Sequence, residues 1–69
     1  MAVMSSLQAA RHDQLLTRVE LAARAGVHPM TIYHVERGRV SPSWRTRKLL
    51  SRALGIPEEE LFREYAETG

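Results

Sequence analysis

Residues 16–42 decide the fold and read LTRVELAARAGVHPMTIYHVERGRVSP. Thr17 begins a Thr-x-x-Glu pattern, the capping box that opens a helix, and this pattern predicts a helix over residues 18–25. Gly26 follows as the left-handed residue that commonly ends a helix. A second helix is expected over residues 29–36, because it begins with a proline whose missing N–H costs nothing in the first turn. The stretch therefore predicts two short helices joined by a sharp turn.

The residue types within this stretch are those that two closely crossing helices need. Ala22 is small enough for the point where the helices approach each other, and Gly26 can adopt a positive φ in the turn without strain. Apolar anchors fix the second helix to the core and leave its opposite face free. These anchors are expected to be Val27, Ile32 and Val35. A helix-turn-helix unit is therefore expected over residues 18–37.

Three more helices are expected outside this unit. Ser5 begins a capping pattern before a helix over residues 6–14. Pro57 opens the last helix, whose first turn holds three glutamates that favour the macrodipole. No run of four or more residues alternates with the period of a strand, so the fold class is all-α, a compact five-helix domain. A fourth helix is expected over residues 44–54, with an apolar face formed by Trp44, Leu49, Leu50, Ala53 and Leu54.

The chain has 69 residues and no cysteine, which bounds its organisation. A chain of this length forms one domain, residues 1–69, with residues 1–5 expected as a flexible tail. There is no thiolate metal site, and no apolar run approaches the ~20 residues that span a bilayer. We expect a cytoplasmic protein with no membrane partner, no metal and no other cofactor.

The sequence shows no catalytic constellation. His28 and His34 are six positions apart, which places them on different faces of a helix, unlike the i, i+4 spacing of a helical metal pair. The serines lack the sequence context of an activated nucleophile. We therefore do not expect an enzyme.

Charge is divided unevenly along the chain. Residues 1–55 hold nine of the ten basic side chains and three acidic ones, a net charge of +6, whereas residues 56–69 carry a net charge of −4. A basic body with an acidic end fits a surface that binds a polyanion, and it also fits ordinary solvated surface charge.

Residues 16–42 resemble the phage-repressor and xenobiotic-response-element class of helix-turn-helix proteins. The segment Thr-Ile-x-x-Val-Glu-Arg-Gly-x-x-x-Pro within them is especially similar, and residues 53–62 resemble the end of that domain. The resemblance covers about residues 7–62. It implies a compact five-helix domain whose third helix enters the major groove of DNA, usually as a dimer.

The resemblance also implies a set of DNA-binding residues. Base-reading positions fall on the outward face of the third helix, at Pro29, Met30, Tyr33 and His34, with Thr31 at the edge. The resemblance places Arg37 and Arg39 beside the DNA backbone. Further phosphate contacts are expected at the start of the second helix, whose N–H groups are free, and near the start of the fourth; these residues are Thr17, Arg18 and Arg45. Arg18 departs from the family, in which glutamine is frequent at this position. Phosphate contacts position a protein without reading sequence, whereas apolar side chains can touch thymine methyl groups. An apolar outward face also fits a surface that binds a protein partner.

Two further expectations concern structure. In the resembled family the glutamate before Arg-Gly often pairs inside with an arginine of the first helix, which implies an Arg11–Glu36 pair here; the alternative is two unrelated surface charges. A homodimer is expected through Ile56, Phe62 and Tyr65, because the last two aromatics are left over on a short helix and aromatics are enriched at interfaces. In the alternative, Phe62 folds back onto Trp44 and Leu54 and the chain is monomeric.

The sequence thus predicts a regulator of transcription, a repressor, that binds specific double-stranded DNA as a dimer. The alternatives are an antitoxin or a restriction-modification controller of the same fold. A third alternative is an interaction module that binds a protein such as a toxin or polymerase instead of DNA.

Overall fold

The structure of the protein is a computed structural model that describes residues 4–65. Its helices are α1 (Ser6–Asp13), α2 (Arg18–Ala25), α3 (Pro29–Glu36), α4 (Trp44–Leu54) and α5 (Glu58–Leu61), followed by the short 3-10 helix η1 (Arg63–Tyr65). The described residues contain no strand, which confirms the all-α fold class. The bounds of α2, α3 and α4 are those expected, and α1 ends one residue earlier. Residues 1–3 of the expected tail lie outside the described range.

Side chains cap the helices where the sequence patterns predict them. The Thr17 hydroxyl accepts a hydrogen bond from the Glu20 N–H at 3.0 Å, and the Glu20 carboxylate accepts one from the Thr17 N–H at 2.8 Å. Ser5 caps α1 by accepting from the Gln8 N–H. These bonds satisfy backbone donors that the first turn of a helix leaves free.

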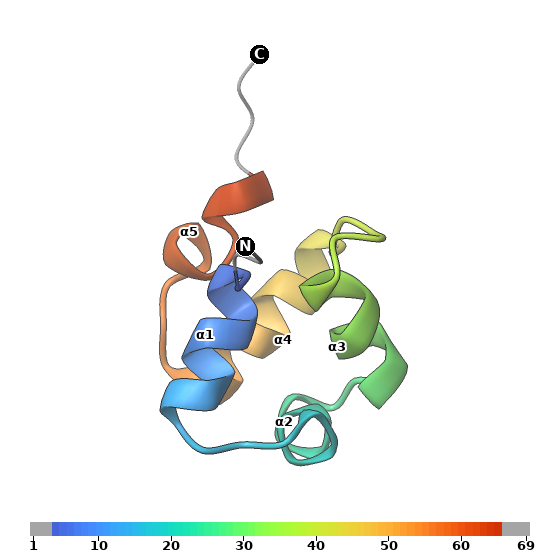
Figure 1. The fold of residues 1–69 in the computed structure, drawn as a ribbon, viewed down its shortest axis with the longest axis vertical. Coiled ribbons are helices and arrows are strands. Elements are labelled where there is room, and N and C mark those ends of the chain that lie inside the picture. Colours follow the sequence, from blue (N-terminus) through green and yellow to red (C-terminus); the bar gives the residue numbers. More distant parts are fainter. Residues whose placement is uncertain (1–3, 66–69) are drawn as a thin grey trace.

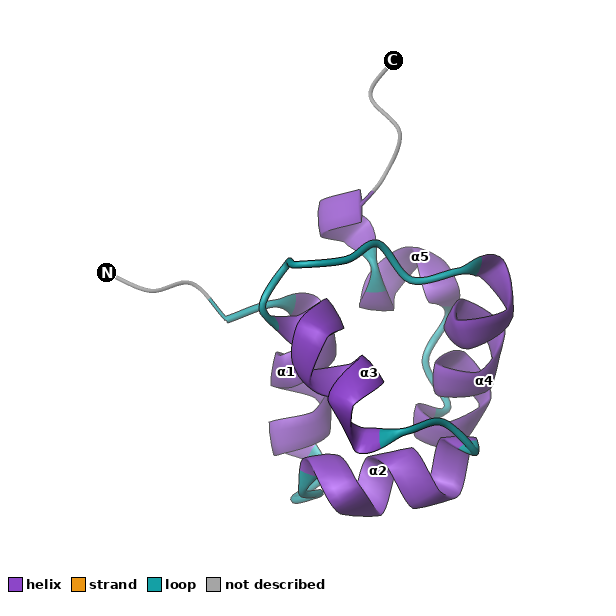
Figure 2. Ribbon diagram, turned by 90° about the vertical axis from the view of Figure 1, so that its right-hand side faces the viewer, coloured by secondary structure: helices purple, strands orange, loops and turns teal. Residues whose placement is uncertain are grey.

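A tight turn sets α2 across α3. Gly26 has a φ of +78°, and the N–H of Val27 bonds back to the carbonyl of Ala22 at 3.0 Å, as in a helix-ending Schellman turn. Figure 2 shows α2 lying crosswise to α3, with α4 beside them. The end of α1 closes with the same type of turn, but the left-handed residue there is Leu15, with a φ of +59°.

The core lies between all five helices. α1 and α5 lie on one side of the domain and α3 on the other, with α4 between them (Figure 1). Burial of apolar area supplies the main driving force for a chain without disulfides or metals. The buried apolar residues are Leu7, Leu16, Leu21, Ala22, Ala25, Ile32, Val35, Leu50, Leu54, Leu61 and Phe62. No helix in the described range is long and apolar enough to cross a bilayer.

Two expectations about aromatic residues are wrong. Trp44 does not belong to the apolar face of α4: it is 70% exposed at the first position of that helix. Phe62 is not left over for an interface, because it is only 2% exposed. α5 stops after four residues, and Phe62 at its end packs into the core of its own chain. The guanidinium of Arg47, rather than Trp44, lies over its ring, 5.6 Å from the centroid.

Candidate functional site

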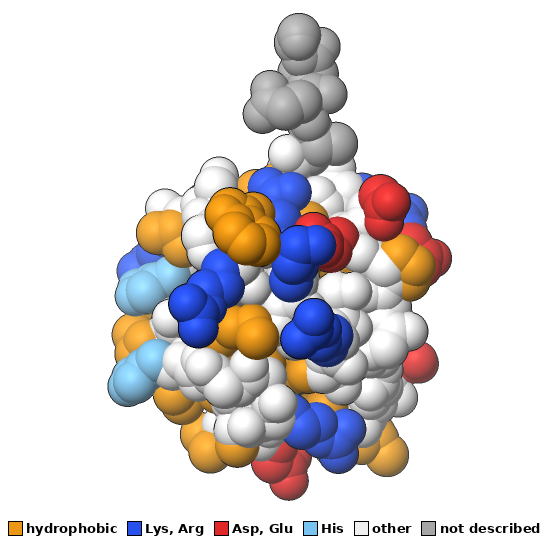
Figure 3. All heavy atoms as spheres, turned by 180° about the vertical axis from the view of Figure 1, so that it is seen from behind, with side chains coloured by type: hydrophobic (Ala, Val, Ile, Leu, Met, Phe, Trp, Pro, Cys, Tyr) orange, Lys and Arg blue, Asp and Glu red, His pale blue; other side chains and the backbone are white. Residues whose placement is uncertain are grey.

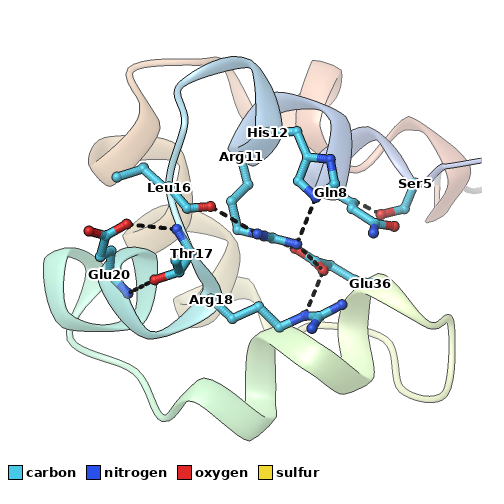
Figure 4. A network of polar contacts seen from close by, with 9 residues as sticks. All are labelled: Ser5, Gln8, Arg11, His12, Leu16, Thr17, Arg18, Glu20 and Glu36. Carbon is cyan, nitrogen blue, oxygen red and sulfur yellow. Dashed lines mark hydrogen bonds and ion pairs between the residues drawn. The ribbon is translucent and has the colours of Figure 1, made fainter.

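A buried carboxylate joins three helices. Glu36, at the end of α3, accepts hydrogen bonds from Arg11 on α1, at 2.6 Å from Nε to Oε2 and 3.0 Å from Nη2 to Oε1. Oε1 also accepts from the Nε of Arg18 on α2 at 3.0 Å. Figure 4 shows the two guanidinium groups meeting the same carboxylate. We call these three residues the Glu36 clamp.

The two arginines of the Glu36 clamp differ in exposure. The side chain of Arg11 is 7% exposed and also donates to the carbonyl of Leu16, so it is committed to the interior. The side chain of Arg18 is 37% exposed. The expected Arg11–Glu36 pair is therefore present, and Arg18, expected to meet phosphate, has an intramolecular partner as well.

The outward side of α3 gathers cations around one aromatic ring. The guanidinium carbons of Arg18, Arg37 and Arg39 lie 5.1, 5.6 and 5.8 Å from the centroid of Tyr33. Such distances are within the range of cation–π attraction. We call these four residues the Tyr33 cluster. It contains one of the expected base-reading residues and three of the expected phosphate contacts.

The other expected base-reading residues differ in accessibility. Met30 is 49% exposed, whereas Pro29, Thr31 and His34 are half-buried. The His34 ring lies edge-on to Tyr33, with centroids 5.4 Å apart. Its Nδ1 is buried without a hydrogen-bond partner among the described residues, so an outward contact of this ring must use Nε2.

The remaining expected phosphate contacts lie at helix N-termini. Thr17 caps α2, and Arg45 is exposed in the first turn of α4. Within residues 4–65, no carboxylate pairs with Arg45. Figure 3 shows cationic side chains spread over the face opposite to that of Figure 1, with an acidic side chain among them and others toward the edges.

The remaining residues of the expected dimer interface are partly used within the chain. The Tyr65 hydroxyl donates to the carbonyl of Val35 at 2.6 Å and so ties η1 to the end of α3. Burial, and then the neighbouring Glu64, raises the pKa of the Tyr65 phenol, against a smaller lowering by Arg47. Ile56 is half-buried against the core.

Sequence reasoning missed the second arginine of the Glu36 clamp and the Tyr33 cluster. Tyr33 on α3 and Arg37 at its C-cap are four positions apart, a spacing that places two side chains on one face, and this signal was available. Arg18 belongs to another helix, so its contacts depend on the crossing of α2 and α3. No group of His, Cys, Asp or Glu residues in the described range could hold a metal ion.

A family model described as a helix-turn-helix domain matches residues 5–63 of the chain. The matched range includes α1 to α5, the Glu36 clamp and the Tyr33 cluster. No curated protein matches the chain at a significant level.

Proposed function

The chain belongs to the helix-turn-helix domain family. We therefore propose that it is a sequence-specific regulator of transcription that binds double-stranded DNA. Regulation then depends on occupying a promoter or contacting polymerase, without chemistry on the DNA. The family is typically not enzymatic, which agrees with the lack of any catalytic constellation in the sequence. We further propose a prokaryotic or phage repressor that works in the cytoplasm.

One observation carries the proposal: the two sides of α3 are built differently. The inward side is fixed by Ile32, Val35 and the Glu36 clamp, all of them buried or bonded. The outward side presents Arg37 and Arg39, which are exposed and which no carboxylate within residues 4–65 neutralises. A rigid helix with free cations around it suits a groove lined by phosphates.

The proposed roles follow the sequence assignment. Phosphates are met by Thr17, Arg18, Arg37, Arg39 and Arg45, and base edges by Pro29, Met30, Thr31, Tyr33 and His34. Apolar Met30 and Pro29 suit thymine methyl groups, and His34 supplies a hydrogen-bonding nitrogen. The N–H groups of Arg18 and Val19, which the capping box leaves without a partner among the described residues, add a further site for a phosphate oxygen.

Binding measured against salt tests the proposal. If four arginines contact phosphates in each half of a dimer, the slope of log affinity against log salt should be about −5 to −7, since each full contact contributes about −0.9. Selection of bound sites from random duplexes would then give the recognised sequence. A slope near zero, or no enrichment of any sequence, would overturn DNA binding.

The homodimer remains a proposal with a revised interface. Phe62 does not belong to the revised interface, because it is buried in its own chain. Ile56 and Tyr65 stay as candidates, in the acidic part of the chain, and Tyr65 lies against the end of α3. Two recognition helices should then lie ~34 Å apart, to meet successive major grooves. Sedimentation at micromolar concentration should show a dimer that Ile56→Arg dissociates; a monomer that binds DNA tightly would contradict the interface.

A second function is favoured by the exposure of Trp44. A tryptophan 70% exposed on a small protein is unusual, and Met30 and Val40 are also about half exposed. An antitoxin, a restriction-modification controller or an interaction module that binds a toxin or polymerase would use exposed apolar side chains of this kind. Trp44→Ala should then abolish retention of that partner while DNA binding persists. If DNA binding is absent and a partner is retained, the interaction module is the correct assignment.

A further inference from the structure

Tyr33 is placed to collect arginines from two separate parts of the chain. Arg18 comes from the first turn of α2, whereas Arg37 and Arg39 follow α3. All three guanidinium carbons lie within 5.8 Å of one ring centroid. Like charges held so close together repel one another, so the ring must offset part of that repulsion. The negative face of an aromatic ring provides such an attraction.

The backbone after α3 is shaped to bring both later arginines to this ring. Gly38, between them, has a φ of +71°, a conformation that other residues rarely adopt. The N–H of Arg39 bonds back to the carbonyl of His34 at 2.9 Å and fixes this turn. The chain therefore turns back at Gly38, so that Arg37 and Arg39, on either side of this glycine, both approach Tyr33.

The charge of the Tyr33 cluster is only partly neutralised. Arg18 is paired with Glu36, at 3.0 Å, whereas Arg37 and Arg39 have no carboxylate partner in the described part of the chain. Two free guanidinium groups beside a third form forked donors that match phosphate oxygens. The ring itself has no strong donor or acceptor besides its single hydroxyl.

We propose that Tyr33 is a positioning residue, whose ring gathers Arg18, Arg37 and Arg39 into one site for phosphates of the DNA backbone. In this role Tyr33 contributes affinity that is independent of sequence, and it does not read a base. The inference rests on the proposed DNA binding and, for Tyr33 alone, replaces the base-reading role given under the proposed function. Because the ring already orders the arginine side chains, less side-chain entropy is lost when DNA binds.

Two substitutions separate the ring from the hydroxyl. Tyr33→Leu removes the ring, and Tyr33→Phe keeps it. The probes are a duplex selected by the unmodified protein from a random library and an unrelated duplex of the same length. Tyr33→Leu should weaken binding to both duplexes by the same factor, about tenfold or more, because the loss of each cation–π contact is expected to cost a factor of about two to five. Tyr33→Phe should bind both like the unmodified protein.

A double-mutant cycle tests whether Tyr33 acts through the arginines. Tyr33→Leu combined with Arg39→Ala should weaken binding by less than the product of the two single effects, because each change removes the same contact. Tyr33→Leu combined with Arg52→Ala is the matched control, since Arg52 is exposed on α4 outside the Tyr33 cluster, and these effects should multiply. Multiplying effects with Arg39 would overturn the proposal.

The outcomes distinguish this inference from the proposed function. If the unmodified protein binds neither duplex, the proposed function fails. If it binds both, and either variant changes base preference while leaving the unrelated duplex unaffected, Tyr33 reads a base and the inference is wrong. A measurement on the unmodified protein without DNA keeps the proposal testable even if a variant fails to fold. Nuclear magnetic resonance should show that the ring shifts side-chain protons of the three arginines upfield. Unshifted protons would overturn the proposal.

Discussion

The inward and outward sides of α3 treat charge in opposite ways. On the inward side, the fully buried carboxylate of Glu36 has both oxygens bonded to arginines. On the outward side, Arg37 and Arg39 are exposed, and only the ring of Tyr33 lies near them. The difference shows that the fold uses charge pairing to fix where the helix lies, and leaves the cations on the outward side without a carboxylate partner among the described residues. Stability and binding should therefore respond to different substitutions.

The largest expected effect is on the inward side. Glu36→Gln leaves two guanidinium groups without a counter-charge, one of them buried. Breaking a buried pair in this way costs about 3–5 kcal/mol, a large part of the roughly 5–15 kcal/mol that holds a domain together. Urea denaturation gives the measurement. Glu20→Gln is the control: the residue is exposed, glutamine also occurs in capping boxes, and the free energy of unfolding should change little. If Glu36→Gln changes the free energy of unfolding as little, the inward side of α3 does not depend on charge pairing.

The next effect separates the two arginines of the Glu36 clamp. Arg11→Ala should destabilise by about 3 kcal/mol, because its guanidinium is buried and also bonds a carbonyl. Arg18→Ala should cost about 1 kcal/mol or less, because its side chain is 37% exposed. Double-mutant cycles with Glu36→Gln should show strong coupling for Arg11 and weak coupling for Arg18. Equal coupling would mean that Arg18 is as much a part of the interior as Arg11.

A smaller effect on stability is expected on the outward side. Arg37→Ala and Arg39→Ala should each change the free energy of unfolding by no more than about 0.5 kcal/mol, as surface substitutions usually do. Each should nevertheless move the salt slope of DNA binding toward zero by about 0.9 per lost phosphate contact and protomer. A loss of stability above ~1 kcal/mol with an unchanged slope would make these residues structural and erase the distinction between the two sides.

The smallest effect concerns a carboxylate away from α3. Burial alone raises the pKa of Glu64, but hydrogen bonds from Ser6, with the nearby Arg63, more than offset it, so the pKa lies below its usual 4.5. The lowered pKa adds stability above pH 4.5 that is lost as the pH falls through the folded-state pKa. Thermal melting of Glu64→Gln should therefore show a small deficit at pH 6 that closes as the pH falls below 4.5 and through the folded-state pKa. A deficit that persists at low pH would exclude this linkage.

Local patterns predicted the helices well because the signals lie within a few residues of each other. The capping box at Thr17 and the turn at Gly26 depend on backbone geometry that sequence determines directly. The helix-turn-helix character and the Arg11–Glu36 pair could be inferred as well, from a resemblance whose motif spans both helices of the unit.

The aromatic residues could not be placed in the same way. Trp44 and Phe62 are both large and apolar, yet one is exposed and the other buried. Their burial depends on how the start of α4 and the end of α5 pack, which involves residues far apart in the sequence. The same holds for Arg18, whose partners Glu36 and Tyr33 both lie on another helix.

The turn after α1 carries a consequence for experiments on all these variants. Leu15 adopts the left-handed conformation that glycine adopts in the turns after α2, α3 and α4, and its side chain is 89% exposed. A residue with a Cβ loses about 1–2 kcal/mol in this conformation, so Leu15→Gly should raise stability by about 1 kcal/mol after allowing for the greater freedom of the unfolded chain. The position lies outside the Glu36 clamp and the Tyr33 cluster. It therefore offers a reinforced parent protein in which severely weakened variants stay folded long enough for their DNA affinity to be measured.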